Sequence, residues 1–324
     1  MALLLVIVRW VHLWASILLP ALFIFESVIV APFVRNPQET LLPLFLSLHR
    51  STYRFAWATW AIAQLSWIAW LWLVTASMSG EDMLACINPE ALGTVLFVTQ
   101  FGHLWLMRLV VSLVFGISLW LLARSSRRRS ILVNLAWLSL VELVSLAWVG
   151  HAAASPGGYG AIHLLGDALH LLTSAFWPGA LAPLATFFFV LLKSGQTEAL
   201  GMAGLVVRRF STSSLIAVAL MALTGLLNSV FLVGNVRALL TTPYGQLLAS
   251  KLVLFLLMVG FGAWNLLVLK PKLTGDVLTA DVVHEEGAIR SLLRNVLLEI
   301  GLGTGVILIV GLLGSTPPAT FVTR

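Results

Sequence analysis

The residues best suited to chemistry are two histidines and an aspartate in the fifth apolar run of the chain: His163, Asp167 and His170. Steps of four and three residues, at 3.6 residues per turn, hold these side chains within a stripe about 60° wide. Imidazole nitrogens ligate transition metals, and a nearby carboxylate can add a ligand or fix a histidine tautomer. The stripe therefore predicts a metal site. The alternative is a polar stripe that holds helices together through hydrogen bonds.

Other apolar runs also contain polar residues. Such residues inside a membrane normally face the bundle interior and mark function. We expect His12 and His151 to join the three residues above as metal ligands. The supporting polar and charged groups are Arg9, His103, Arg108, Glu142, Asn228 and Lys251. In the orientation given below, nearly all of them fall in the outer half of the bilayer.

Two cations, Arg108 and Lys251, cannot ligate a metal ion while they are protonated. We expect them to neutralise Asp167 or Glu142, or to bind an anionic group. The buried carboxyls of Glu142 and Glu26 could carry protons or pair with a neighbour, and for Glu26 we expect pairing.

The composition predicts an all-α membrane protein. The chain is 60% hydrophobic and only 10% charged, with a mean hydropathy of +1.00, whereas soluble domains are about 25% charged. About 20 apolar residues span a bilayer, and about eight such runs occur, near 2–32, 55–77, 104–123, 131–149, 162–192, 212–233, 247–269 and 293–314. The first run is too long and aromatic for a signal peptide and lacks a small-residue cleavage site. We predict one integral membrane domain over 1–324.

The basic residues predict the orientation. An even number of spans puts both termini on one side, and basic loops stay in the cytoplasm. With both termini in the periplasm, 14 of the 19 Lys and Arg residues become cytoplasmic, including the Arg-rich turn at 124–129. The high pI of about 10.1 therefore reflects topology, and we expect no nucleic-acid binding.

The two halves of the chain resemble each other. His12-Leu-x-x-Ser16-x-x-x-Pro20 matches His170-Leu-x-x-Ser174-x-x-x-Pro178, and the run from Thr99 to Arg108 matches the run from Thr242 to Lys251. This pattern predicts two parallel four-helix repeats. In this division, residues 1–130 belong to the first half and include its first three helices, and residues 131–324 make up the remainder of the chain. In this arrangement His12 would pair with His170, and Arg108 with Lys251. Chance similarity between apolar helices is the alternative.

Two outer loops carry further candidate ligands. His151 begins a Gly-rich loop before the fifth run and could receive or pass on a metal. Cys86 follows Met78 and Met83, a grouping of soft ligands that is compatible with copper(I). Ordinary loop residues are the alternative in both places. Nucleotide-binding loops, nucleophile elbows and zincin motifs are absent from the sequence, so we do not expect ATP-driven transport by this chain alone. We expect a transporter or metal-binding membrane protein sooner than an enzyme.

Several motifs together resemble the copper resistance protein D family. They cover residues of about 150–270 and are Gly150-His151-Ala152, Asp167-Ala-Leu-His170, Trp177-Pro-Gly179-Ala-Leu181, Arg209-Phe210-Ser211-Thr212, Thr224-Gly225-Leu-Leu-Asn228, Thr242-Pro-Tyr-Gly245 with Lys251, and Asn265. The N-terminal half matches by general layout. One departure is Trp177-Pro178-Gly179-Ala180-Leu181 in place of Trp-x-Gly-Gly-Leu, and Pro178 should kink the fifth helix.

The resemblance implies an eight-helix bacterial inner-membrane protein that moves copper between periplasm and cytoplasm, often with a small periplasmic copper-binding partner of the CopC type. A different function is a membrane oxidoreductase with a quinone, or with haem b ligated by His12 and His170. A third interpretation treats the polar residues as contacts between helices only.

Overall fold

The computed structural model describes residues 1–31, 41–79, 88–124, 128–150, 158–195, 197–274 and 282–322. All of the regular elements in these ranges are helices. Eight of the helical segments are long and apolar enough to cross a membrane, which confirms the predicted number.

The elements of the first half, up to residue 148, are α1 (Ala2–Ile24) with a π-helical extension (Phe25–Val30), α3 (Leu42–Ser79), α4 (Pro89–Val98), α5 (Gln100–Leu122), and α6 (Arg128–Ser145) with a final 3₁₀ turn (Leu146–Trp148). Those of the second half are α7 (Gly158–Phe176), α8 (Leu181–Ser194), α9 (Thr197–Leu232), α10 (Val236–Thr241), α11 (Pro243–Trp264) with a π-helical extension (Asn265–Leu269), α12 (Lys270–Thr274), α13 (Val282–Leu313) and α14 (Ala319–Val322).

Several spanning helices are longer than the apolar runs from which they were predicted. Helix α3 begins at Leu42, whereas the apolar run begins near residue 55. A helix satisfies its backbone hydrogen bonds internally, so it can continue beyond the bilayer while its side chains become polar. Hydropathy therefore locates the bilayer crossing and misses the helix ends.

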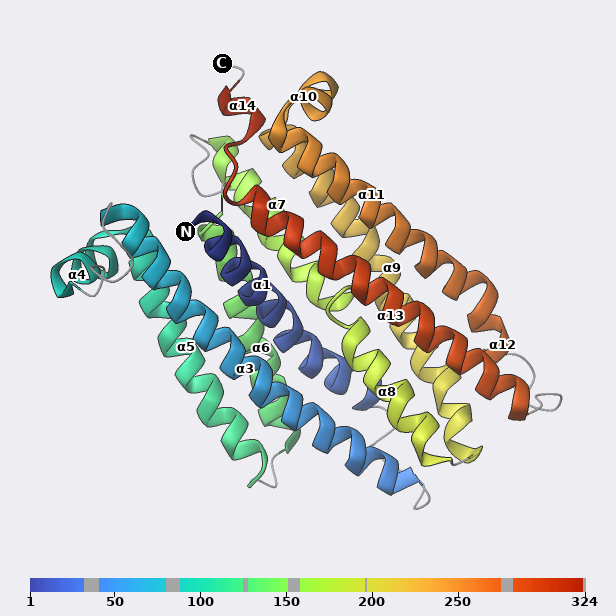
Figure 1. Cartoon of the computed structure of the whole chain (residues 1–324). Helices are drawn as coiled ribbons and strands as arrows, with labels where there is room; N and C mark the ends of the chain where they lie inside the picture. The colour runs from blue at the N-terminus through green and yellow to red at the C-terminus, as the bar shows by residue number, and fades with distance from the viewer. Residues whose placement is uncertain are drawn as a thin grey trace.

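Helix α1 lies in the middle of the bundle and connects the two halves (Figure 1). It packs against α3 and α6 of the first half and against α7 and α13 of the second. Within the second half, α7 packs against α9 and α11 against α13. Large apolar side chains such as Leu65, Ile117 and Leu267 point outward and are exposed, as expected for lipid-facing surface.

The fifth spanning helix, for which a kink at Pro178 was predicted, is interrupted there by a break between two helices. Helix α7 ends at Phe176 and α8 begins at Leu181, because proline lacks an N–H group and its ring clashes with the preceding turn. A β-carbon at Gly179 would lie 2.8 Å from the Ile17 side chain. The break therefore packs directly on α1, and only glycine fits there.

Two short helices, α4 and α10, were not predicted. Each precedes a spanning helix through the same junction. Thr99 accepts a hydrogen bond from the Gly102 N–H, and Thr242 accepts one from the Gly245 N–H, both at 3.0 Å. A β-carbon would lie 2.0 Å from a carbonyl oxygen at Gly102 and 2.2 Å from one at Gly245. These are positions that the sequence comparison of the two halves aligns.

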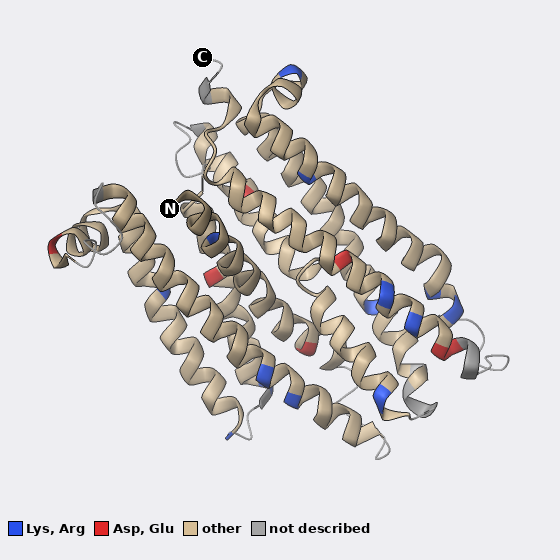
Figure 2. Cartoon of the chain, viewed as in Figure 1, with Lys and Arg blue, Asp and Glu red and all other residues tan. Residues whose placement is uncertain are grey.

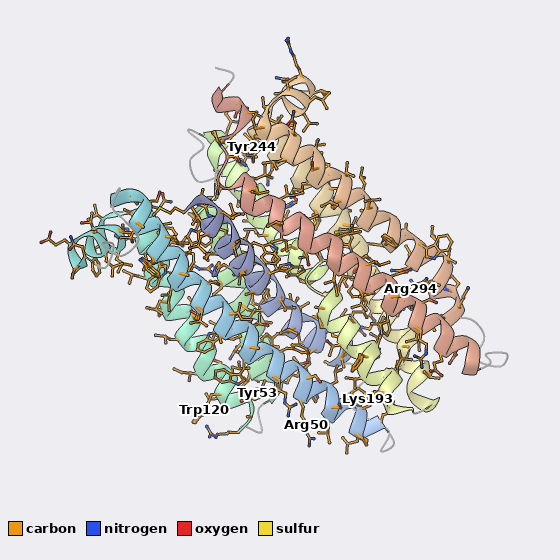
Figure 3. All side chains as sticks on the ribbon, in the orientation of Figure 1. Arg50, Tyr53, Trp120, Lys193, Tyr244 and Arg294 are labelled. Carbon is orange, nitrogen blue, oxygen red and sulfur yellow. The ribbon has the colours of Figure 1, made fainter. Side chains whose placement is uncertain are left out.

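Charge is distributed unevenly along the bundle. Both termini lie at one end (Figure 1), and most Lys and Arg residues gather toward the other end (Figure 2). In Figure 3, Tyr244 lies at the end with the termini, and Arg50 and Lys193 lie at the opposite end. There Arg124 packs over the Trp120 ring at 3.9 Å. Such aromatic and basic residues anchor helix ends at a membrane interface.

Candidate functional site

The predicted stripe on α7 faces α9. The two helices run antiparallel, and each member of the stripe has its own partner on α9. The three pairs are His163 stacked on Phe231 with ring centroids 4.7 Å apart, Asp167 bonded to Asn228 at 3.1 Å, and His170 bonded to Thr224 at 3.0 Å. The helical spacing thus predicted the shared face correctly.

The stripe extends along the helix instead of converging on one point. Seven residues of α-helix rise about 10 Å, so His163 and His170 are too far apart along the axis to bind one ion together. Among the described residues, three or more His, Cys, Asp or Glu side chains do not come together in a group that could hold a metal ion. Asp167 and His170, three residues apart, are the two members that lie closest together along the axis, and they form the candidate site on α7.

The ring of His170 is held in one orientation. The Thr224 hydroxyl donates to the Leu220 carbonyl oxygen at 2.8 Å, so it accepts from the Nδ1–H of His170. This tautomer, assigned from the hydrogen-bond network, leaves the lone pair on Nε2. A β-carbon at Gly225 would lie 3.5 Å from the ring, in ordinary van der Waals contact, so the imidazole packs directly on the α9 backbone. Metal-binding histidines are commonly oriented by such a bond from the other nitrogen.

The carboxylate of Asp167 lies at the junction of several elements. Its Oδ1 accepts a hydrogen bond from the Asn228 amide, and its Oδ2 lies 3.6 Å from the position of a β-carbon at Gly150. Lys251 and Tyr244 of α11 both interact with it electrostatically. Lys251 also interacts with His170. Of the partners expected for Lys251, Asp167 is the one with which it interacts.

The uppermost histidine of the stripe, His163, is only 1% exposed and stacks on Phe231 with the rings 10° from parallel. His151 directly follows Gly150 in the sequence, but it lies outside the described residues, as do Cys86 and Met83.

A second polar cluster surrounds His12 in the first half. His12 is 1% exposed and stacks on Trp67 at 4.9 Å. Its Nδ1 lies 3.0 Å from the Ser66 hydroxyl and 3.2 Å from the Ala63 carbonyl oxygen. Its Nε2 accepts a hydrogen bond from Arg108 at 3.0 Å. Both ring nitrogens are therefore engaged.

The Arg108 side chain closes this cluster. It donates to the Glu142 carbonyl oxygen and to the Ser145 hydroxyl, the latter at 2.6 Å, and it lies over the Trp67 ring at 4.6 Å. The Glu142 carboxyl interacts with it electrostatically and is hydrogen-bonded to Ser112. The guanidinium is thus surrounded by side chains and backbone of three helices.

These contacts differ from the pairing predicted across the two halves. His12 is hydrogen-bonded to Arg108, and His170 interacts electrostatically with Lys251, so each histidine interacts with the cation of its own half. The bis-histidine haem alternative gains no support from this geometry, because His12 would first have to break its bond to Arg108. His12 as a metal ligand meets the same obstacle.

The other supporting residues have local partners. Arg9 donates to the Gly314 carbonyl oxygen at 2.7 Å and to the Ser315 hydroxyl at 2.9 Å, so it links α1 to the end of α13. His103 is exposed and lies 2.9 Å from the Phe97 carbonyl oxygen at the α4–α5 junction. Glu26 pairs with His49, which confirms the expected pairing.

One buried polar group was missed. Glu299 of α13 is 1% exposed and accepts a hydrogen bond from the Asn265 amide at 2.8 Å. Asn295 in turn donates to the Asn265 oxygen at 2.8 Å, and Trp177 hydrogen-bonds the same carboxyl. An acidic residue within the eighth apolar run was the sequence signal that could have revealed it.

Two protein-family models match the chain. Copper resistance protein D matches residues 204–313, and the copper resistance protein D-like N-terminal domain matches residues 1–161. Together the two matches cover most of both halves.

Three curated proteins are similar to the chain. Copper resistance protein D of Pseudomonas syringae pv. tomato is 30% identical over 81% of this chain and 82% of its own length. The inner membrane protein YebZ of Escherichia coli (strain K12) is 30% identical over 76% and 78%. The copper transport protein CutJ of Bacillus subtilis (strain 168) is 29% identical over 70% of this chain and 42% of its own length. No solved structure matches the chain.

Proposed function

Because the chain belongs to the copper resistance protein D family, we propose that it accepts copper at the periplasmic face of a bacterial inner membrane and transports it inward. Asp167 and His170 form the core of the entry site. Copper is here the transported substrate. The observation that carries the proposal is the orientation of His170, whose Nδ1–H is bound by Thr224 so that Nε2 is left to ligate.

The charge balance of the site suits reversible binding. In the absence of copper, the Lys251 ammonium compensates the Asp167 carboxylate. An incoming copper ion competes with this ammonium for the carboxylate, and the ammonium favours release again by repulsion. A transport site must bind well enough to be entered and weakly enough to be left. The Asp167–Lys251 interaction fits that requirement.

Two further residues are proposed to contact copper. One follows α6 in the sequence, and the other lies in the outer part of α7. His151 is proposed as a further ligand, because Gly150 just before it lies against Asp167. His163, about 10 Å further out along α7, is proposed as an earlier contact on the way in. His12 is kept as a candidate ligand only if Arg108 releases it.

The proposed orientation places both termini and the Asp167 end of the bundle in the periplasm. It rests on the excess of Lys and Arg at the opposite end (Figure 2). The recurring junctions at Thr99 and Thr242 support an arrangement of two parallel repeats. A small periplasmic copper-binding protein of the CopC type would deliver copper to this face.

Copper binding by the purified protein tests the proposal. The protein in lipid nanodiscs is titrated with copper, once under reducing and once under oxidising conditions, in competition with a chromogenic chelator. His170→Ala and Asp167→Asn should each weaken copper binding at least tenfold. His103→Ala serves as the matched control, because His103 is exposed and lies away from α9.

The same variants are then compared for copper accumulation in cells. The amount of each variant in the membrane is measured alongside. Accumulation should fall for His170→Ala and stay unchanged for His103→Ala. Undiminished copper binding by His170→Ala would contradict the proposal.

A further inference from the structure

Among the described residues, four carboxyl groups lie inside the bundle, three of them buried and that of Asp167 partly buried, and their surroundings differ. Three of them have a basic partner: Glu26 pairs with His49, Glu142 interacts with Arg108, and Asp167 interacts with Lys251. The fourth is Glu299. Its hydrogen-bond partners are the neutral side chains of Asn265 and Trp177.

A cavity of about 150 Å³ lies beside Glu299, between α8, α9, α11 and α13. Its walls are mostly apolar, with Asn265, Ser211 and Ser214 as the other polar residues, and Glu299 is its only ionisable lining residue. The Ser214 hydroxyl is buried without a hydrogen-bond partner among the described residues. Such a cavity is large enough and polar enough at one wall to hold water.

The cations on the helices that pack here do not line this cavity. They are Lys193 on α8, Arg208 and Arg209 on α9, Lys251 on α11, Lys270 just after it, and Arg290 and Arg294 on α13, and all are absent from its walls. An ionised carboxylate without a positive partner is strongly disfavoured in a membrane interior. Glu299 must therefore be neutralised by something that binds it.

The hydrogen bonds around Glu299 distinguish its two carboxyl oxygens as positions for a bound proton. Asn295 orients the Asn265 amide, which donates to Oε1 of Glu299. The other oxygen, Oε2, lies 3.8 Å from the position of a β-carbon at Gly262, a lining residue of the cavity. Oε2 thus lies beside a wall residue of the cavity, and Oε1 is the oxygen that the Asn265 amide holds.

We propose that Glu299 is a proton-binding site of the second half, loaded through the cavity between α8, α9, α11 and α13. Its position also points to a coupling role, which rests on the proposed copper function. Trp177, at the break of the fifth helix, follows His170 by seven residues, about 10 Å of helix. A movement of α7 on copper binding would shift the Trp177 N–H relative to Glu299. This shift would change the proton affinity of Glu299.

Infrared spectroscopy of the copper-free protein in nanodiscs tests the proton site. The C=O stretching band of a protonated carboxyl should be present at neutral pH, and its Glu299 component should disappear in Glu299→Gln. Glu286→Gln is the matched control, because Glu286 is exposed and paired with Arg290 at the surface, and it should leave the band unchanged. Trp177→Phe should shift the band to higher frequency through loss of a donor, which gives a readout if Glu299→Gln fails to fold.

The outcomes separate this inference from the copper proposal. The absence of a Glu299 component, or a component that responds to Na⁺ at constant pH, overturns the proton site. If the band is present, copper binding should release or take up protons in the wild type and not in Glu299→Gln, as measured with a pH dye. Equal proton exchange in both overturns the coupling role. Neither infrared result depends on whether His170 binds copper.

Discussion

The polar clusters of the two halves use similar residues to opposite effect. In the first half, His12 is closed in by Arg108, Ser66 and Trp67, and both of its ring nitrogens are engaged. In the second half, His170 is held by Thr224 through one nitrogen, and the Lys251 ammonium interacts with it electrostatically. A directly bonded guanidinium closes the first site, and a more distant ammonium leaves the second open.

The difference can be followed position by position. In the register that aligns His12 with His170, Ser66 corresponds to Thr224, and each contacts the imidazole of its own half. In the same register Arg9 corresponds to Asp167, and Trp70 to Asn228. Arg9 lies over the Trp70 ring at 5.3 Å, where Asp167 bonds to Asn228. The first half therefore has a cation packed on an aromatic ring where the second half has a carboxylate that can attract a metal ion.

The largest effect is expected from Arg108→Met. This change removes the hydrogen-bond donor of the His12 Nε2 and the Ser145 hydroxyl and the positive partner of the Glu142 carboxyl. Removing one partner of a buried charged network costs about 3–5 kcal/mol. Thermal unfolding in detergent should show this loss for Arg108→Met and a clearly smaller one for Lys251→Met. Equal losses would remove the distinction between a closed and an open cluster.

The two junction glycines give a matched pair of the next size. Gly102→Ala and Gly245→Ala each force a β-carbon against a carbonyl oxygen, and overpacking of this kind costs about 1–3 kcal/mol. Both variants should unfold at lower temperature by similar amounts. Gly260→Ala on α11 is the control, because its β-carbon would meet nothing within 4 Å. A large loss in only one junction would argue against equivalent halves.

Thr224→Val and Ser66→Ala sharpen the comparison at the imidazoles. Loss of a residue that orients a metal-binding histidine typically weakens metal binding about 10–100-fold. Thr224→Val should therefore weaken copper binding by this factor, whereas Ser66→Ala should leave it unchanged. Chelator competition measures both. If Ser66→Ala has the larger effect, then His12 is the ligand and the assignment of the two clusters is reversed.

The smallest effect is expected from Lys251→Met on copper affinity. Removing the ammonium frees the Asp167 carboxylate and abolishes its repulsion of copper. At about 1.4 kcal/mol for each factor of ten, one partly screened charge interaction is worth about tenfold. Copper should bind about tenfold more tightly and dissociate more slowly in stopped-flow measurements. Weaker binding would mean that Lys251 supports the site in another way.

The sequence predicted those features that depend on spacing along one helix or on composition. The eight spans follow from apolar runs, because only apolar helices are stable in lipid. The shared face of His163, Asp167 and His170 follows from 3.6 residues per turn, and the break at Pro178 follows from its missing N–H. The short helices α4 and α10 were not predicted, because they are too short to cross a membrane and give no such apolar run.

Tertiary packing decided which polar groups meet. The sequence contains His12 and Arg108 in separate apolar runs, and only the packing of α1 against its neighbours brings the guanidinium to the imidazole. The neutral surroundings of Glu299 likewise depend on Asn265 and Trp177 arriving from two other helices. Helical periodicity fixes the face on which a side chain lies, but its partner depends on the rotation, depth and contacts of every neighbouring helix.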